Sequence, residues 1–316
     1  MVSLLRQSLA FLILTLGYQT IAEAGTITGS VSSDTYKFSP NSTASEISAS
    51  GAFSMTYGDT TIYVGTHQAN ANNQNAIIAS ITGNTINWIK ADYENLGPDS
   101  DARGLVWDGL NLYVVLTIDG GAPLADGGLE RFTQNGWLNS YGAGGGAQAS
   151  VLLKLDPSNG GAEAGTFVHA KLSSGSTNTI SPTGLSLVDD KLVFDGLSFF
   201  SPLRADKTAM ECDGSSPFDY RAIFSSDLST VISSEAVRCD GLTALTDINE
   251  IIGGDSGTGG DSGTGGDSGT GGDSGTGGDS GTGGDGDMQD VPEPAVGIGL
   301  ASIALSLRRM RRGKRA

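Results

Sequence analysis

The chain has 316 residues, a formal net charge of −17 at pH 7, two cysteines and two histidines. This length allows one large domain or two small ones. An acidic chain repels phosphate backbones, which disfavours nucleic acids as partners, and two histidines give little support for a catalytic triad or a histidine-rich metal site.

The first 24 residues have the features of a secretion signal. Arg6 precedes an apolar run at residues 9–16, and Ala22-Glu-Ala24 gives the small-x-small pattern that signal peptidase accepts. The apolar run is too short to cross a bilayer well as a helix. We therefore expect residues 1–24 to be a signal peptide, signal peptidase to be a partner, and the mature chain to begin at Gly25.

Residues 25–250 have the composition of an all-β domain. Short runs of Thr, Val, Ile, Leu and Tyr are separated by Gly, Asp and Asn, and no stretch keeps a helical apolar period beyond two turns. Three segments share one pattern: a strand that opens at Gly, a turn rich in Gly, Asp or Asn, and a second apolar strand. They are residues 51–66, 104–117 and 184–198, and further apolar strands follow at residues 76–81, 150–155 and 220–224.

Meanders of three or four strands that recur every 50–80 residues or so are typical of propeller blades. The pattern resembles secreted bacterial β-propeller repeats, in which a Gly…Leu-Tyr-Val hairpin precedes a Leu-Lys-Leu-Asp strand, and the resemblance covers most of residues 50–240. Because four blades are the usual minimum, residues 26–31 and 241–246 could combine into a fourth. A β-sandwich with a similar number of strands is the alternative.

The loop at residues 119–149 is the most unusual part of this body, because its glycine-rich frame carries Phe132, Trp137 and Tyr141. Loops of this length are usually functional or disordered, and exposed aromatic rings suit stacking against carbohydrate or contact with another protein. These three residues and Trp107 are therefore candidate ligand-binding residues, with extracellular polysaccharide as the expected ligand. The alternative is that Phe132 and Trp137 fold back onto the sheet edge.

Acidic residues gather near Trp107. Asp99 and Asp101 are candidates for weak calcium binding, against the alternative of a solvated acidic loop; no other cofactor or metal is expected. Residues 99–107 are similar to the sialidase Asp-box, but the spacing differs by one residue and Val106 replaces threonine. That motif is structural and implies no catalytic residue. A secreted glycan-active enzyme with paired carboxylates is the alternative to a non-catalytic protein.

Cys212 and Cys239 are the only cysteines. An even pair in an oxidising compartment is expected to form one disulfide, whereas a zinc site would need further ligands nearby. We therefore expect a disulfide between these two residues.

Residues 251–290 are of low complexity, and Gly-Gly-Asp-Ser-Gly-Thr occurs five times from Gly253 onward. The repeat has no apolar side chain to bury, so burial cannot offset the entropy lost on ordering. We expect a disordered, flexible linker of Gly, Asp, Ser and Thr with a mean reach of roughly 30–37 Å.

Residues 291–316 form a three-part tail. An apolar stretch at residues 295–307 would span about 20 Å as a helix, against a hydrocarbon core of about 30 Å. The basic residues after it resist translocation, so this short membrane helix would halt export with the body outside. The tail opens with Val291, Pro292, Glu293 and Pro294, and its basic end includes Arg308, Arg309, Arg311 and Arg312.

This order of motifs closely resembles the PEP-CTERM sorting signal of Gram-negative-type bacteria. The resemblance covers the tail alone, and it implies recognition by an exosortase, with cleavage near Pro292-Glu293-Pro294. Proteins with this tail are often linked to extracellular polysaccharide and biofilm matrix. The sequence thus predicts an exported, non-catalytic protein of the cell surface or extracellular matrix. A tail anchor that is never cleaved is the alternative.

Overall fold

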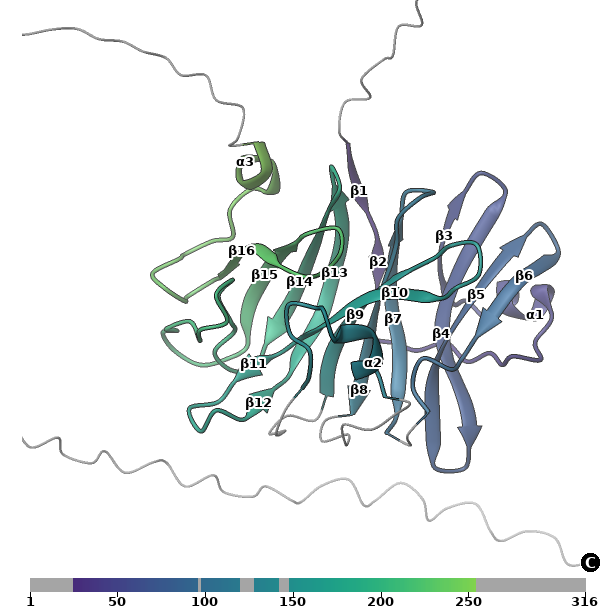
Figure 1. Cartoon of the computed structure of the whole chain (residues 1–316), viewed down its shortest axis with the longest axis horizontal. Coiled ribbons are helices and arrows are strands. Elements are labelled where there is room, and N and C mark those ends of the chain that lie inside the picture. Colours follow the sequence, from purple (N-terminus) through teal and green to yellow (C-terminus); the bar gives the residue numbers. More distant parts are fainter. Residues whose placement is uncertain (1–24, 96–97, 120–127, 142–147, 254–316) are drawn as a thin grey trace, which may run out of the picture. The chain divides into compact units, whose positions relative to one another are not determined.

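The computed structural model describes residues 25–95, 98–119, 128–141 and 148–253. Nearly all of its regular elements are strands, which confirms the all-β prediction. Most of them belong to three antiparallel meanders, each made of four strands that are consecutive in one part of the chain (Figure 1).

We call these meanders the first, second and third sheets, in chain order. The first sheet contains β3 (Phe53–Tyr57), β4 (Thr60–Asn70), β5 (Asn73–Thr82) and β6 (Thr85–Lys90). The second contains β7 (Ser100–Trp107), β8 (Leu112–Asp119), β9 (Gln148–Leu155) and β10 (Ala162–Val168). The third contains β13 (Ile180–Val188), β14 (Lys191–Ser198), β15 (Phe218–Phe224) and β16 (Val231–Ala236).

The three predicted hairpins are confirmed as β3–β4, β7–β8 and β13–β14. Their turns contain Gly58, Gly109 and Asp189, which have φ angles of 58°, 97° and 57°. These are left-handed values that Gly adopts freely and Asp tolerates better than most residues. The residues of the turns therefore predict the positions of these three hairpins correctly.

The suggestion that residues 26–31 and 241–246 combine into a fourth blade is wrong. The N-terminal strand β1 (Thr26–Thr28) pairs with β13, and β2 (Ser30–Val31) pairs with β7, so each widens an existing sheet. Residues 241–246 form no strand. The backbone groups of residues 26–31 bond to two different sheets and are not available for a blade of their own.

The second sheet is buried on both faces. Leu112, Val114 and Leu116 of β8 pack in a cluster with side chains of the first sheet, including Ile62 and Ile78. Tyr113 and Val115 point to the opposite face and pack with side chains of the third sheet, among them Leu187 and Phe194. Because successive strand residues face opposite sides, a continuous apolar run is what a sheet between two others requires.

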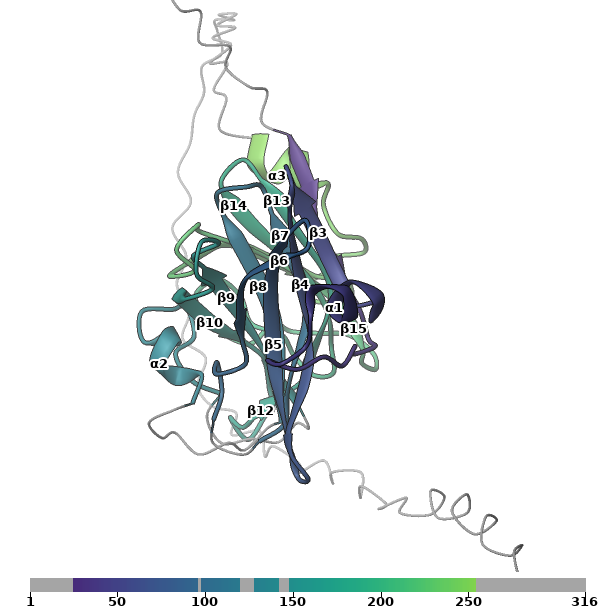
Figure 2. The same ribbon diagram turned by 90° about the vertical axis from the view of Figure 1, so that its right-hand side faces the viewer.

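Short helices cover the outer faces of the two flanking sheets. The helix α1 (Ala44–Ala49) buries Ile47 with Ile77 and Ala79 of the first sheet. Its N-terminus carries a capping box in which Thr43 and Glu46 each bond the other's backbone N–H. The helix α3 (Ile248–Gly253) rests Ile248 and Ile251 on the third sheet, and Figure 2 shows both helices from the side.

The remaining elements are small. The strands β11 (Ala170–Lys171) and β12 (Thr177–Asn178) form a two-stranded ribbon. The helix α2 (Glu130–Thr133) lies in the predicted aromatic loop.

Candidate functional site

Two of the candidate ligand-binding aromatics from the long loop are buried. Trp137 is 2% exposed, its Nε1–H donates to the Ala205 carbonyl at 2.9 Å, and its ring meets Phe224 edge-on at 5.9 Å. Tyr141 is also buried and meets the ring of His169 edge-on at 5.7 Å. Trp137 belongs to the core between the second and third sheets and Tyr141 to the core between the first and second, so these two residues of the loop fold back onto the sheets.

Phe132 and Trp107 are placed differently. Phe132 is half-buried, and the Arg131 guanidinium lies 4.3 Å above its ring centre. Trp107 is 7% exposed and lies beneath Tyr57, with 5.8 Å between the ring centres. The exposed aromatic ring at this end of the sheets is therefore Tyr57, which is 58% exposed.

Tyr57 is not among the residues that the sequence singles out, whereas Phe199 belongs to a second long loop, residues 198–219, which the disulfide is expected to hold in place. These two are the aromatic residues among the exposed large apolar side chains of the described ranges. Tyr57 ends β3 directly before the β3–β4 turn, and its ring packs over Gly109 of the next hairpin. Its position at the end of a strand, beside a turn, was the one sequence feature that could have indicated an exposed ring. The contact with Gly109 joins two hairpins and could not be read from one of them.

The calcium candidates are bound to protein groups. Asp99 accepts the backbone N–H of Gln74 at 2.8 Å. Asp101 accepts the hydroxyl of Thr66 at 2.7 Å and forms an ion pair with Arg103 at 2.9 Å. Across the described ranges, no group of three or more His, Cys, Asp or Glu side chains is arranged to hold a metal ion.

Two further carboxylates have shifted pKa values: Asp119 at the end of β8 and Asp108 directly after β7. Burial, with added repulsion from Asp99 and Asp101, raises the pKa of Asp119 above its ordinary value. Burial would also raise the pKa of Asp108, but hydrogen bonds from Asn111 and Leu110 outweigh it and lower that pKa. Asp108 therefore holds the β7–β8 turn as an anion.

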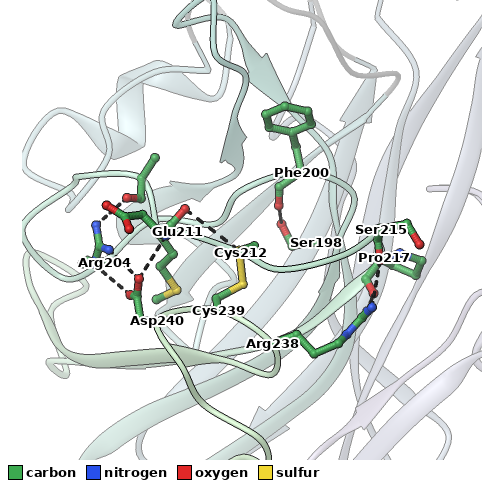
Figure 3. Close-up of a disulfide and its surroundings, with 12 residues drawn as sticks. Ser198, Phe200, Arg204, Glu211, Cys212, Ser215, Pro217, Arg238, Cys239 and Asp240 are labelled. Atoms are coloured by element: carbon green, nitrogen blue, oxygen red, sulfur yellow. Dashed lines mark hydrogen bonds and ion pairs between the residues drawn. A yellow bond between two sulfur atoms is a disulfide. The ribbon is translucent and has the colours of Figure 1, made fainter. Parts of the chain in front are cut away.

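Figure 3 shows the disulfide between Cys212 and Cys239, which confirms the predicted pairing. The two residues face each other in an antiparallel bridge outside the named strands. Cys239 is 1% exposed and packs in the core between the second and third sheets. The disulfide thus joins the loop after β14 to the segment after β16.

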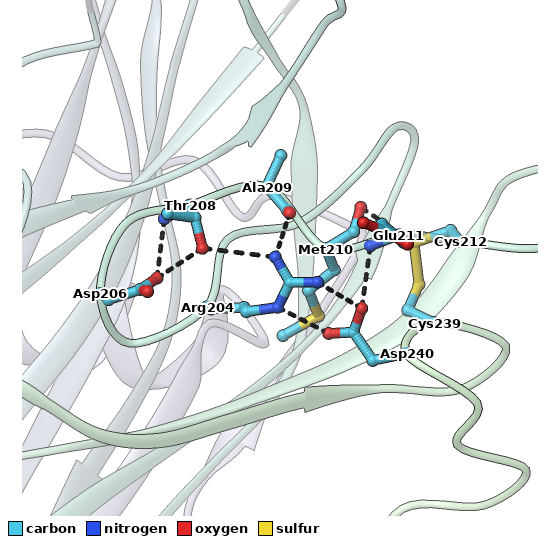
Figure 4. A network of polar contacts seen from close by, with 9 residues as sticks. All are labelled: Arg204, Asp206, Thr208, Ala209, Met210, Glu211, Cys212, Cys239 and Asp240. Carbon is cyan, nitrogen blue, oxygen red and sulfur yellow. Dashed lines mark hydrogen bonds and ion pairs between the residues drawn. A yellow bond between two sulfur atoms is a disulfide. The ribbon is translucent and has the colours of Figure 1, made fainter. Parts of the chain in front are cut away.

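A polar network holds the same two segments (Figure 4). The guanidinium of Arg204 donates two hydrogen bonds to the Asp240 carboxylate, from Nη2 to Oδ1 and from Nε to Oδ2, the latter at 2.8 Å. Asp240 also accepts the backbone N–H of Glu211 at 3.0 Å. A two-pronged contact of this kind fixes orientation as well as distance. The hydrogen bonds to Asp240 raise the pKa of Arg204. Burial would raise the pKa of Asp240, but the hydrogen bonds from Arg204 and from the Glu211 N–H outweigh it and lower that pKa.

Arg238 secures the other side of the disulfide. Its guanidinium donates to the carbonyls of Ser215 and Pro217, at 3.0 and 2.7 Å, and lies over the Phe218 ring. These contacts and the network around Arg204 hold the loop between β14 and β15, residues 199–217, in place on both sides of the disulfide.

From the sequence, His67 is expected to follow a strand end and His169 to lie in a strand, both partly exposed; instead His67 lies within β4, and His169 lies between β10 and β11. His169 is buried, and its Nδ1 lies 3.0 Å from the Ala170 carbonyl. Burial lowers the pKa of His169, and hydrogen bonds to the backbone only partly compensate. His67 is half-buried on β4, opposite Asn75.

Comparisons with protein-family models, with curated proteins and with solved structures find no match for this chain. The sorting motif Val291–Pro294, the arginine-rich end and the proposed membrane helix lie outside the described residues, as do residues 1–24. Among the helices of the described residues, none has the length and apolar character needed to cross a membrane.

Proposed function

We propose that this chain is an exported bacterial protein of the cell surface or extracellular matrix, and that it acts as a binding or structural component without catalysis. The disulfide Cys212–Cys239 is the observation that carries the proposal. Disulfides persist in oxidising compartments outside the cytosol and are rare within it. The disulfide is compatible with export, and the sequences of the two ends supply the route.

The tail supports the sorting step. In this proposal signal peptidase removes residues 1–24, the apolar stretch at residues 295–307 pauses in the membrane, and an exosortase-type enzyme cleaves near Pro292-Glu293-Pro294. The repeats from Gly253 onward separate the folded body from the membrane until that cleavage.

The experiment that tests this proposal is intact-mass analysis of the protein from its native host, compared with a variant in which Arg308, Arg309, Arg311 and Arg312 are all alanine. We expect the natural chain to start at Gly25 and to end near Pro294. The variant should keep its tail, because the cations no longer hold that end on the cytoplasmic side. A Gln289→Ala variant is the control and should be processed normally. A natural chain of full length refutes the sorting proposal.

We propose extracellular polysaccharide as the ligand, bound through accessible aromatic rings. Tyr57 and Phe199 are 58% and 42% exposed, and Phe132 is half-buried, so each offers some ring surface. The net charge of −17 favours a neutral or basic glycan over an acidic one. On a glycan array, Tyr57→Ala, Phe132→Ala and Phe199→Ala should each weaken retention of neutral glycans. Ile232→Ala, which removes an exposed apolar side chain that is not aromatic, should not.

We propose that the three sheets are propeller-like repeats that do not close into a ring. The support is that each repeat is a meander of four consecutive strands in the same order. A β-sandwich is the alternative, because the sheets pack face to face.

A further inference from the structure

The N-terminal segment at residues 26–38, which we call the strap, bonds to all three sheets in turn. It runs first along β13 of the third sheet, then along β7 of the second, and last beside β4 of the first. Figure 1 shows β1 and β2 between β13 of the third sheet and β7 of the second. One short segment therefore ties together three meanders that each form from local sequence.

The contacts with the third and second sheets continue beyond the paired strands. The backbone N–H of Gly29 donates to the Leu185 carbonyl at 2.8 Å, and that of Ser32 donates to the Arg103 carbonyl at 2.9 Å. The guanidinium of Arg103 also donates to the carbonyl of Ser33. Ile27 and Val31 of the strap pack against the core between these sheets.

At the first sheet the strap lies parallel to β4. Lys37 pairs with Thr66, whose backbone N–H donates to the Tyr36 carbonyl at 2.9 Å and whose carbonyl accepts from the Phe38 N–H at 3.3 Å. The side chain of Phe38 is buried in the cluster with Ile47.

Glycines line the path of the strap. A Cβ on Gly104 would lie less than 3.0 Å from the Ser30 carbonyl and the Val31 side chain, and a Cβ on Gly65 equally close to Tyr36 and Phe38. On the strap itself, a Cβ on Gly29 would approach Leu105 and Val106 in the same way. None of the three has a φ that demands glycine, so their common feature is the close passage of another backbone.

We propose that β4, β7 and β13 form an acceptor for an extended strand, and that the strap is a separable occupant that docks after these three sheets have formed. The order of synthesis supports this sequence of events. The strap is made before all three of its partner strands, and β13, the latest of them in the chain, ends at Val188. Until β13 is complete, the edges of β7 and β13 that the strap covers stay open. The inference goes beyond the proposed function and does not depend on export or on a polysaccharide ligand.

The test uses the full chain with a specific protease site in place of Pro40 and Asn41, which lie in the exposed turn between the strap and α1. After cleavage, a fluorescent synthetic peptide of residues 25–38 is added, and size-exclusion chromatography separates free from bound peptide. We expect the cut strap to stay with the folded body and the labelled peptide to replace it over time. Strap exchange between two copies, seen as dimers, also supports the acceptor.

Matched peptides test the glycine path. A Gly29→Val peptide should bind at least about tenfold more weakly, because its side chain enters a closely packed space. A Thr28→Val peptide should bind normally, because residue 28 is exposed.

Two results overturn the proposal. One is loss of the β-sheet circular-dichroism signal on cleavage, which would make the strap an inseparable part of the core. The other is release of the strap from a folded body that does not bind the labelled peptide.

Discussion

Removing the disulfide between Cys212 and Cys239 should lower the free energy of unfolding of the body by about 3.5 kcal/mol. The two cysteines are 27 residues apart. Opening a loop of that length returns about 12 cal/mol/K of chain entropy to the unfolded state, which gives this free energy at 25 °C. For a domain of this size the loss corresponds to a fall in Tm of roughly 7–14 °C.

The folded state should change little, since the network around Arg204 and Asp240 and the contacts of Arg238 hold the same segments without the disulfide. The assay is urea unfolding of the natural chain and of the double variant Cys212→Ala/Cys239→Ala, each with and without a reductant. Reductant should destabilise the natural chain and leave the double variant unchanged. Equal stability of the oxidised and reduced natural chains would refute the reasoning.

Three further changes test the core, the strap path and the buried histidine. Trp137→Ala should cost about 3–5 kcal/mol in urea unfolding, because it empties a core site, whereas Phe132→Ala should cost less; similar losses would place Trp137 at the surface. Gly104→Val should lower the free energy of unfolding by about 1–3 kcal/mol, because the added side chain is overpacked against the strap. Gly184→Ala, whose added Cβ would lie 3.3 Å from its nearest neighbour, should lower it by less. An equal loss in both variants would contradict the described path of the strap. Burial lowers the pKa of His169 below its value of about 6.5 in the unfolded chain, so the unfolded chain binds more protons below that pH and stability should fall as the pH drops from 6.5 towards the lowered pKa. His169→Gln should flatten that slope, and an unchanged slope would assign it to other groups.

Features that depend on residues close together in the sequence were predictable. Gly58 and Gly109 mark turns by their own backbone preference, and the apolar run at residues 112–116 indicates a strand whatever lies around it. The pairing of Cys212 with Cys239 followed from there being no other cysteine.

Features set by distant pairing were not predictable in this way. Residues 26–31 carry a strand pattern, but nothing local says that they divide between β13 and β7. Trp137 stands in a glycine-rich loop, and its burial depends on Phe224 and Ala205, which come much later in the chain. The exposure of Tyr57 likewise depends on how two separate hairpins meet.

The central claim is that the body lies outside the cytosol, and thiol trapping in living cells of the native host tests it most directly. Cells are treated with a membrane-permeant alkylating reagent, and the N-terminus and both cysteines are then identified by peptide mass spectrometry. We predict an N-terminus at Gly25 and a disulfide-linked, unalkylated pair of Cys212 and Cys239. A cytosolic chain that keeps Met1 and carries the alkyl label on both cysteines would contradict the account.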